Sequence, residues 1–489
     1  MDLFEILSKY NSYLIGGAIR DFFLVKKITD LDIVIITEVY NFKKIITLLF
    51  KNFKIFPLDK ERNIYRITLN NKTIDITNSN SIIDDLKNRD FTINALAIKL
   101  SKCKIYDQKD YFKLKINKKN IIDEFNGLKS LEKKEIKLVN ENSIKDDPLR
   151  ILRAYRFFAQ YGFKIDKKLK KEIIDKKNTL LNVSRERIRD ELIKIFNSDR
   201  VYETTKEMIK TEVLLELFPE LKKQIGCATV YYGKAGLINH TLNVIKRLDM
   251  FFEKPQLYLD IHQILKEKLK KEKYLIKISG LLHDIAKPHT ARIIEKRLRF
   301  FGHEQKGAEI SENILREYRF SKDEIKYIKT IIAHHLRIGN IAHNDNITNK
   351  AILRIFYDLK EYSFGLIVLS WADYASHISI KKLLSIRDKV REKPFELKKQ
   401  LPKTGFRKTL RFLQVVNMIT KKYDEYKKNS NIKPIIDGYT IMEILKIPPS
   451  KTVGNIIKKL INLQLEGKII TKHQAINYIK SLKINNLQK

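Results

Sequence analysis

The chain has 489 residues, which predicts about three domains. Its 97 Lys and Arg against 58 Asp and Glu give a formal net charge of +39, and its hydrophobic fraction of 43% excludes general disorder. No apolar stretch reaches the ~18–20 residues of a membrane span, and two cysteines exclude a disulfide framework or a cysteine-based zinc site.

A net charge of this size predicts a polyanionic partner, of which nucleic acid is the commonest. The alternative is compositional bias without functional meaning, because Lys, Ile and Asn are frequent throughout the chain and lysines on the surface cost little stability. The first residues, Met-Asp-Leu-Phe-Glu, lack the basic region of a signal peptide. We therefore expect a soluble, cytoplasmic, multidomain protein with no membrane partner.

The N-terminal part of the chain alternates strand and helix patterns, which predicts a small α/β domain. A Gly16–Gly17 turn follows the first strand and precedes a helix over Ala18–Val25. The expected strands are Ser12–Ile15, Leu31–Thr37, and Ile64–Leu69 paired with Lys72–Thr77 around an Asn70–Asn71 turn. The polar, basic segment Lys102–Lys119 is expected to form a surface hairpin.

A carboxylate cluster accompanies the glycine turn. Gly16 and Gly17 let the backbone approach a phosphate at a helix N-terminus. Asp30 and Asp32 share one face of a strand, and two such carboxylates repel each other unless a cation lies between them. Asp75 interrupts an apolar strand, where Asp is disfavoured. Three carboxylates beside a phosphate-binding turn predict two-metal nucleotidyl transfer with Mg²⁺; the alternative places them on a solvated turn and face.

From Asp147 onward, apolar residues recur at helical spacing, which predicts a continuous helical array. Nine of the ten histidines lie between His240 and His377. Because imidazole is the commonest transition-metal ligand, this crowding predicts a metal site. Its centre is expected at the adjacent pair His283–Asp284.

Five blocks resemble, in the same order, the class II tRNA nucleotidyltransferases, the family of CCA-adding enzymes and bacterial poly(A) polymerases in the polymerase-β superfamily. The blocks are Gly16–Asp21, Asp30–Asp32, Arg89–Leu96, Asp146–Phe157 and Ser184–Ile188. The stretch around His283–Asp284 resembles the HD phosphohydrolase superfamily. These resemblances cover essentially the whole chain.

The resemblance implies an α+β protein: a small polymerase-β-like nucleotidyltransferase head, followed by an elongated all-helical neck and body, a helical HD domain and a helical tail. The expected boundaries are 1–124 for the head, 125–225 for the neck and body, 226–395 for the HD domain and 396–489 for the tail. The tail holds 20 Lys and Arg against 6 Asp and Glu. We expect it to hold the tRNA backbone; a solvated surface without a partner is the alternative.

The resemblance also implies roles for residues of the head and neck. Asp30 and Asp32 would hold Mg²⁺, and Asp75 would help activate the primer hydroxyl. Asp147 and Arg150, at i and i+3 on one helix, would select the base. The residues implied in nucleotide binding are Gly16, Gly17, Arg20, Arg89, Asp90, Asn94, Asp147, Arg150, Arg153 and Arg156. The chain departs from the family pattern at two acids. Asp146 occupies a position where the family usually has Glu, and Asp75 occupies one where many members have Glu.

For the HD domain, the resemblance implies a transition metal such as Ni, Mn, Fe or Co. The implied ligands are His240, His283, Asp284 and Asp373, with His303 and His334 available for a second metal or a phosphate. His262, His335, His343 and His377 are expected to be packing or surface residues, and His289 is left undecided.

The function implied is template-independent addition of C and A nucleotides from CTP and ATP to the 3′ end of tRNA. Only 14 positions separate Asp75 from Arg89, whereas complete CCA-adding members carry a longer flexible loop there. The short segment resembles members that add only CC or only A, so both remain open alternatives to full CCA addition. A second activity, as a 2′,3′-cyclic phosphodiesterase or phosphatase, is expected of the HD domain. Two rivals are a poly(A) polymerase of the same family and an HD phosphohydrolase with a non-catalytic RNA-binding head.

Overall fold

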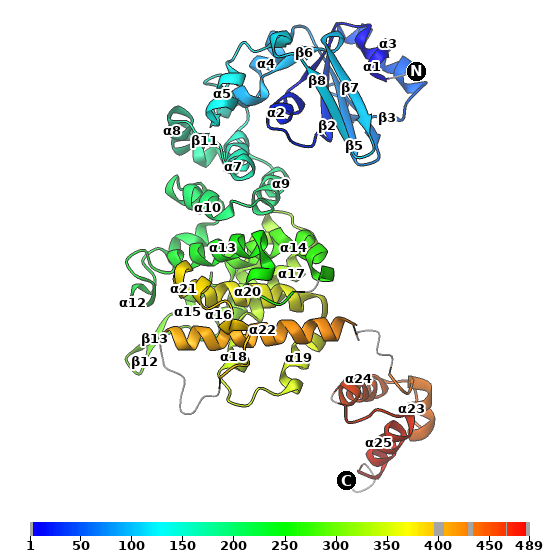
Figure 1. Ribbon diagram of the computed structural model, residues 1–489, viewed down its shortest axis with the longest axis vertical. Coiled ribbons are helices and arrows are strands. Elements are labelled where there is room, and N and C mark those ends of the chain that lie inside the picture. The colour runs from blue at the N-terminus through cyan, green and yellow to red at the C-terminus, as the bar shows by residue number, and fades with distance from the viewer. Residues whose placement is uncertain (1–2, 262, 396–404, 429–433, 466, 486–489) are drawn as a thin grey trace. The chain divides into compact units, whose positions relative to one another are not determined.

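The computed structural model describes residues 3–261, 263–395, 405–428, 434–465 and 467–485 (Figure 1). The chain divides into two compact units, Met1–Pro219 and Glu220–Lys489. Within the described residues, no helix is both long enough and apolar enough to cross a membrane.

The first unit begins with a seven-stranded sheet in the order β3-β4-β5-β2-β1-β6-β9. Only β2 and β5 pair in parallel; the other neighbours are antiparallel. The strands are β1 (Ser12–Ile15), β2 (Asp30–Ile36), β3 (Ile55–Asp59), β4 (Ile64–Leu69), β5 (Lys72–Ser79), β6 (Ala97–Lys99) and β9 (Ile121–Ile122). The predicted hairpin around Asn70–Asn71 is confirmed, with Leu69 opposite Lys72.

The predicted surface hairpin at 102–119 is also confirmed, as β7 (Cys103–Gln108) and β8 (Tyr111–Ile116). The buried Lys72 of β5 holds it to the sheet, because its ammonium donates to Asp107 and to the carbonyl of Gln108. The first helices of the unit are α1 (Leu3–Ser8), α2 (Gly17–Phe23), α3 (Val39–Phe50), α4 (Ile82–Lys87) and α5 (Gly127–Lys133).

The remainder of the first unit is helical apart from the short parallel pair β10 (Glu135–Ile136) and β11 (Lys164–Ile165). Helix α7 buries Leu152, Ala154 and Phe157, which belong to the helical spacing that predicted it. The helices here are α6 (Ser143–Asp146), α7 (Arg150–Tyr161), α8 (Lys167–Lys176), α9 (Arg185–Phe196), α10 (Val201–Lys210) and α11 (Val213–Leu217).

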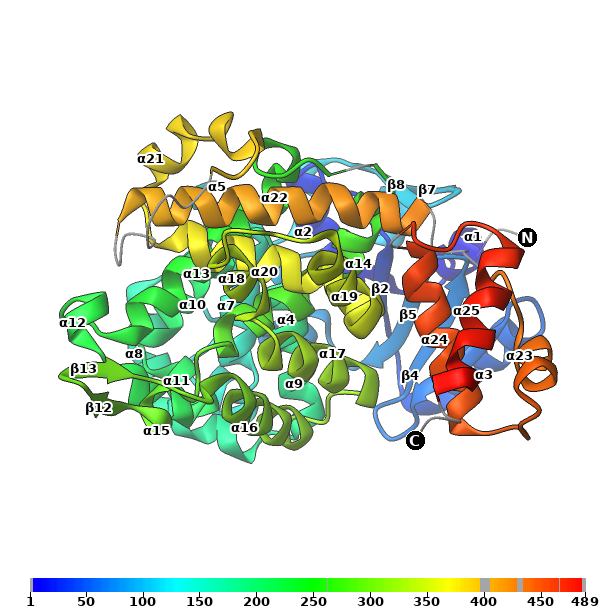
Figure 2. The same cartoon turned by 90° about the horizontal axis from the view of Figure 1, so that it is seen from below.

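The described residues of the second unit form helices and their connections, apart from the small hairpin β12 (Arg292–Ile294) and β13 (Arg297–Arg299). The apolar α20 is buried along most of its length, where α13, α14 and α22 pack against it (Figures 1 and 2). Its first helices are α12 (Thr229–Tyr232), α13 (Leu237–Glu253), α14 (Gln263–Leu282), α15 (Lys287–Thr290), α16 (His303–Glu317) and α17 (Lys322–Ala333). Those that follow are α18 (Arg337–Ala342), α19 (Asn349–Leu359), α20 (Ser363–Ser376), α21 (Ile380–Ser385) and α22 (Phe406–Lys428).

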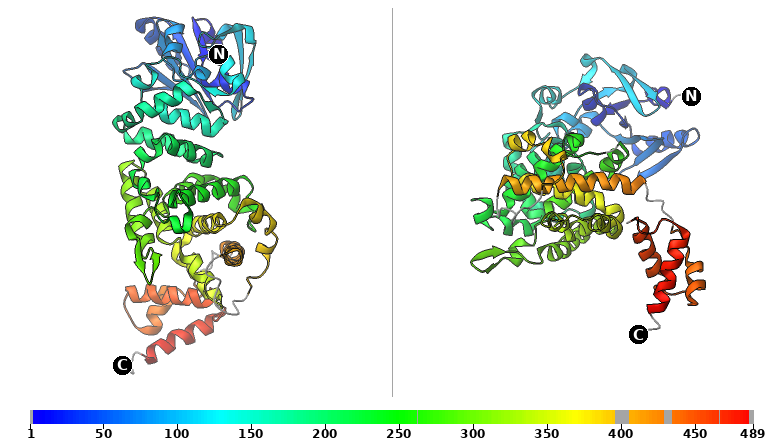
Figure 3. Two further views of the ribbon diagram at one scale, coloured as in Figure 1. Left: turned by 90° about the vertical axis from the view of Figure 1, so that its left-hand side faces the viewer. Right: turned by 60° about the horizontal axis from the view of Figure 1, so that its bottom comes forward.

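The last three helices have an apolar core of their own. They are α23 (Gly438–Leu445), α24 (Lys451–Leu465) and α25 (Lys472–Asn485), which group together in both views of Figure 3. Ile441, Leu460 and Ile479, one from each helix, are buried within this core. The helical form predicted for the tail is therefore confirmed over these residues.

Candidate active sites

The sheet aligns two of the three predicted carboxylates of the head. Asp32 of β2 is the register partner of Asp75 of β5, so their side chains share one face of the sheet. Asp30 shares that face of β2, and its carboxylate accepts a hydrogen bond of 2.6 Å from Thr73 Oγ1. Shielding of Asp32 from water raises its pKa, and Asp75 and Asp30 add to that rise while Arg89 opposes it. The face thus concentrates negative charge.

Asp75 has a partner that the sequence reasoning missed. Arg66, directly opposite on β4, donates from Nε and Nη2 to the two carboxylate oxygens of Asp75, both at 2.7 Å. This bidentate pair fixes the plane of the carboxylate. The signal was available, because a two-residue turn at Asn70–Asn71 places Arg66 opposite Asp75 by counting along the strands.

The glycine turn lies against this carboxylate face. Gly16 has φ +70°, and a Cβ added there would collide with the guanidinium of Arg89 and lie 3.5 Å from Asp32 Oδ2. Arg89 itself lies 3.9 Å from Asp32 and 3.1 Å from Asp85. The turn and Asp32 are therefore brought together with Arg89, a residue that the resemblance implies in nucleotide binding.

A buried polar chain connects the head to α7. The Arg20 guanidinium donates to Asn94 Oδ1 at 2.5 Å, and the Asn94 amide donates to Asp90 at 2.8 Å. Arg153 completes the chain with contacts of 2.7 and 2.6 Å to Asp90 Oδ2. Burial alone would raise the pKa of Asp90, but Arg153, Asn94 and the Phe91 amide hold it below its usual value. Four predicted nucleotide-binding residues thus form one network.

The expectation that Asp147 and Arg150 lie on one helix face is wrong. Helix α7 begins at Arg150, and Asp147 is extended at φ −147° because the following Pro148 disfavours helical geometry there. The Asp147 carboxylate pairs with Arg187 at 2.8 Å, and Arg150 donates to the Asn88 carbonyl at 2.5 Å. The remaining predicted residue, Arg156, pairs with the buried Glu191 at 2.8 Å.

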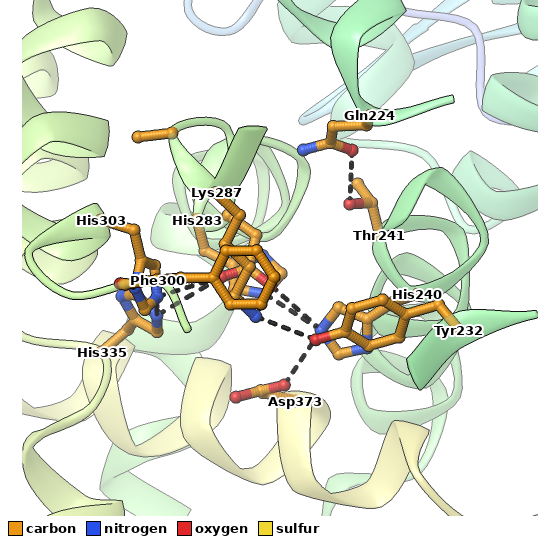
Figure 4. A network of polar contacts seen from close by, with 12 residues as sticks. Gln224, Tyr232, His240, Thr241, His283, Lys287, Phe300, His303, His335 and Asp373 are labelled. Carbon is orange, nitrogen blue, oxygen red and sulfur yellow. Dashed lines mark hydrogen bonds and ion pairs between the residues drawn. The ribbon is translucent and has the colours of Figure 1, made fainter. Parts of the chain in front are cut away.

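The second candidate site gathers histidines and aspartates from α13, α16 and α20 and from the segments that follow α14 and α17 (Figure 4). His240 of α13 and His283, just after α14, approach with their Nε2 atoms 3.4 Å apart. Asp284 Oδ2 lies 3.4 Å from His240 Nε2 and 3.2 Å from His283 Nε2. Asp373 of α20 lies 3.2 Å from His240 Nε2. The other three predicted ligands thus each place one atom within 3.4 Å of His240 Nε2.

The other oxygen of Asp284 faces a second pair of histidines. Nε2 of His303 and Nε2 of His335 lie 3.2 Å apart and at 3.4 and 3.7 Å from Asp284 Oδ1. The expectation that His334 joins His303 is wrong, because His335 is the residue that does; His334 belongs to none of the metal-capable groups found among the described residues. Consecutive residues at the end of α17 point in different directions, so only one of the two faces the site.

The remaining histidines divide between the site and the packing. His377, expected to be a packing or surface residue, is 46% exposed yet lies 3.8 Å from Asp373, in one metal-capable group with Asp373 and His240. His343 packs against Phe412, and His289 pairs with Glu220 at 2.6 Å. His262 lies outside the described residues.

Three segments of the chain match known domains. Residues 12–137 match the poly A polymerase head domain, 162–225 the probable RNA and SrmB-binding site of polymerase A, and 237–377 the HD domain. The chain belongs to the tRNA nucleotidyltransferase and poly(A) polymerase family. The HD match contains every metal-capable group described above.

Relatives in this family span nearly the whole chain. A CC-adding tRNA nucleotidyltransferase of Thermus thermophilus is 24% identical over 96% of this chain and 94% of its own length. An A-adding tRNA nucleotidyltransferase of Deinococcus radiodurans is 22% identical with the same coverage. The fold is that of the Thermotoga maritima CCA-adding enzyme complexed with tRNA, at a TM-score of 0.61 and 20% identity over 98% of this chain and 94% of that one.

Both sites of this family member fit divalent metals, though to different degrees. In the head, the ligands are carboxylate oxygens, which suit Mg²⁺, but Asp30, Asp32 and Asp75 do not converge into a group with all ligand atoms within 4.8 Å.

In the HD site, the buried Asp284 Oδ1 accepts no hydrogen bond from any described residue. Two ligands at about 2.1 Å from one metal lie about 3.0–3.4 Å apart, which matches both Nε2 pairs.

The HD histidines are also prepared as ligands by their other ring nitrogen. Nδ1 of His283, His303 and His335 lies 2.9, 2.6 and 2.7 Å from the carbonyl oxygens of Gly280, Phe300 and Ile332. A proton on each Nδ1 leaves Nε2 with a free electron pair for a metal. Burial lowers the pKa of His335 to about 3, which favours this neutral form.

Sequence reasoning also missed Lys287, whose ammonium lies 2.6 Å from Asp284 Oδ2 and 3.0 Å from the Tyr232 hydroxyl. Its spacing was the signal, because Asp284 and Lys287 are the first and fourth residues of a tight turn, in which the Lys287 amide donates to the Asp284 carbonyl at 3.1 Å. Tyr232 stacks on His240 with ring centroids 5.0 Å apart. These two residues add a cation and an aromatic ring beside the metal ligands.

Proposed function

We propose that this protein adds C and A nucleotides, without a template, to the 3′ end of tRNA. The observation that carries the proposal is the register pairing of Asp32 with Asp75, next to Gly16 and Arg89. The names of the full-length relatives, CC-adding and A-adding tRNA nucleotidyltransferases, support the substrate. The same support favours tRNA over the non-tRNA primers of a poly(A) polymerase.

In the proposed reaction, the terminal RNA hydroxyl attacks the α-phosphate of CTP or ATP and pyrophosphate leaves. Mg²⁺ held by Asp30 and Asp32 would neutralise the phosphates and lower the pKa of the hydroxyl. Asp75, whose carboxylate plane is fixed by Arg66, would accept a hydrogen bond from the attacking RNA hydroxyl and so help to activate it. Arg89 and the Gly16 backbone would position the triphosphate beside Asp32.

The compact segment between Asp75 and Arg89 favours CC addition within this proposal. Strand β5 continues to Ser79, and Ser81 caps α4 by accepting a hydrogen bond from the Ile83 amide at 3.2 Å. The strand end and the helix thus occupy most of this segment, where the family resemblance implies a flexible loop in complete CCA-adding members. Full CCA addition is the alternative.

Primer extension separates these specificities. A tRNA transcript lacking its last three nucleotides is incubated with CTP, ATP or both, and a second transcript ending in CC with ATP alone. Two added C residues and no extension of the CC-ended transcript indicate CC addition, and extension of both transcripts indicates CCA addition. Extension of the CC-ended transcript alone, by one A, indicates A addition. Long adenylate tracts on a non-tRNA primer would identify a poly(A) polymerase. Asp32→Ala should abolish incorporation, while His283→Ala should not.

We further propose that the HD site hydrolyses 2′,3′-cyclic phosphates. The supporting observation is that the two oxygens of Asp284 face two separate histidine pairs, His240 with His283 and His303 with His335. Bound divalent metals would supply an activated water. The water oxygen bonds to phosphorus, one ring P–O bond breaks, and a proton passes to the leaving ribose oxygen. Lys287 is placed to hold a phosphate oxygen.

Turnover of a 2′,3′-cyclic nucleotide with added Mn²⁺, Ni²⁺ or Co²⁺ tests this activity. His283→Ala should abolish turnover and Asp32→Ala should leave it unchanged, the reverse of their effects on nucleotide incorporation. If turnover survives His283→Ala, the HD site is not its source. If no metal supports turnover, the HD region lacks this activity.

A further inference from the structure

A small exposed surface borders the HD site. It consists of α12 and the β12–β13 hairpin through Phe301, which we call the rim. The two parts lie side by side in Figures 1 and 2, and the Tyr231 hydroxyl donates to the Leu298 carbonyl at 2.9 Å. The Tyr231 and Phe300 rings also meet edge to face at 6.5 Å. The rim is therefore one connected surface.

The rim is continuous with the metal ligands. His303 Nδ1 lies 2.6 Å from the Phe300 carbonyl, and only Phe301 and Gly302 separate the two residues in the chain. The Lys287 ammonium lies 5.7 Å from the centre of the Phe300 ring and 2.6 Å from Asp284 Oδ2. Figure 4 shows the Phe300 and Tyr232 rings beside Lys287. The rim thus directly adjoins the residues of the proposed metal centre.

Large apolar side chains are exposed along the rim. Val230 is 81% exposed, Ile293 79%, Phe301 73% and Tyr231 52%. Exposed apolar residues that are grouped together, rather than scattered singly, mark an interaction surface. Exposed Phe and Tyr rings offer flat faces on which unpaired bases stack.

The same rim is strongly basic. Arg292, Lys296, Arg297 and Arg299 are exposed on the hairpin, against one acid, Glu295. No ion pair to any of the four is found among the described residues. Unpaired cations between exposed aromatic rings are the combination that binds a single-stranded backbone and its bases together.

We propose that the rim binds the single-stranded end of an RNA and directs its terminal phosphate to the HD site. The proposal rests on the proposed hydrolase activity and names its substrate as a polymer rather than a free nucleotide. Arg297 and Arg299 contact phosphates upstream of the reacting end, and Tyr231 and Phe301 stack on bases. A mononucleotide has none of these upstream groups, so the rim does not affect its turnover.

Steady-state kinetics of the full chain test this selectivity. The substrates are a single-stranded oligoribonucleotide ending in a 2′,3′-cyclic phosphate and the matching cyclic mononucleotide. Arg297→Ala/Arg299→Ala should raise KM for the oligonucleotide about tenfold and change kcat/KM for the mononucleotide less than twofold. For the oligonucleotide, the slope of log KM against log salt concentration should be lower in this variant by about 1.4. Each of the two lost contacts to a single-strand phosphate contributes about 0.7 to that slope. Equal losses on both substrates, or no loss, would overturn the proposal.

A matched control removes two other exposed charges of the same unit. Lys270→Ala/Lys271→Ala lies on α14, about 18 Å of helix before His283. It should change neither KM. An equal loss with this variant would show that total charge, and not the rim, sets affinity.

Photo-cross-linking keeps the test independent of turnover. The oligonucleotide carries 4-thiouridine next to its terminal residue, and cross-linked peptides are identified by mass spectrometry. Cross-links should fall on residues 229–232 and 290–301 and be lost with Phe301→Ala. Cross-links confined to other segments would overturn the rim proposal even if the HD site hydrolyses RNA ends. Cross-links to the rim without hydrolysis would uphold RNA binding there and contradict the hydrolase proposal instead.

Discussion

Nε2 of His303 and Nε2 of His335 lie 3.2 Å apart, although they come from the start of α16 and the end of α17. Each ring has its Nδ1 on a backbone carbonyl, and both face Asp284 Oδ1. This pair, together with His240 and His283 on the other oxygen, makes Asp284 the shared element of two metal-capable groups.

His335 and its neighbour His334 form a matched pair for testing this arrangement. We expect His335→Ala to lose one bound transition metal per chain after dialysis, measured by mass spectrometry of the metal content. Hydrolysis of the cyclic nucleotide should fall by about 100-fold or more, because a metal ligand is lost. His334 lies outside the group, so His334→Ala should retain both the bound metal and the hydrolysis rate. The reverse pattern would contradict the assignment.

Gly16→Ala should impair nucleotide incorporation. The positive φ of Gly16 costs about 1–2 kcal/mol for any L side chain, and the added Cβ would displace Arg89 from its place beside Asp32. We expect kcat/KM for CTP incorporation to fall about tenfold or more. Gly226→Ala is the control, since Gly226 also has φ +70° but nothing lies within 4 Å of its added Cβ. Equal losses would attribute the effect to strain alone.

Arg66→Ala should slow incorporation because Asp75 loses the bidentate contact that fixes its carboxylate plane. We expect about a tenfold fall in kcat with little change in KM for CTP. Arg66→Lys should rescue part of this loss, since one ammonium cannot replace two parallel donors. Arg62→Ala, on the same hairpin, should have no effect, because Arg62 is 80% exposed and 3.7 Å from its partner Asp59. Unchanged kcat in Arg66→Ala would contradict a positioning role.

Arg153→Ala should destabilise the first unit. Because Arg153 helps to hold the pKa of buried Asp90 below its usual value, the native network stabilises the fold at pH above about 4, and this contribution disappears as pH falls through the folded pKa. Removal of Arg153 leaves a buried carboxylate without its cation. We expect a loss of about 2–3 kcal/mol at pH 7, less than for a fully buried pair because Arg153 is 34% exposed.

Thermal unfolding of the full chain at pH 7 and pH 4.5 measures this difference. The deficit of Arg153→Ala should be smaller at the lower pH, where protonation relieves the uncompensated charge. Lys168→Ala removes one member of an exposed ion pair with Glu141 and should change stability little at either pH. A deficit that grows toward low pH would contradict this account of Asp90.

Patterns confined to one strand or one turn were predictable from the sequence. Strand alternation placed Asp30 and Asp32 on one face, and the Asn70–Asn71 turn fixed the hairpin that carries Asp75. The same turn also predicts that Arg66 lies opposite Asp75. The three-residue spacing of Asp284 and Lys287 likewise predicts that their side chains are close. These relationships depend on local periodicity, which the residue types alone reveal.

Contacts between distant elements needed the tertiary structure. Asp147 and Arg150 have helical spacing, but Pro148 starts the helix later and separates them. The choice of His335 over His334 depends on how the end of α17 packs against α16, and a rotation of about 100° per residue exchanges one for the other. The sequence by itself therefore determined the family, the strand faces and the HD pair. Only packing between elements decided which side chains meet at each site, because side-chain direction depends on the rotation of each helix about its axis.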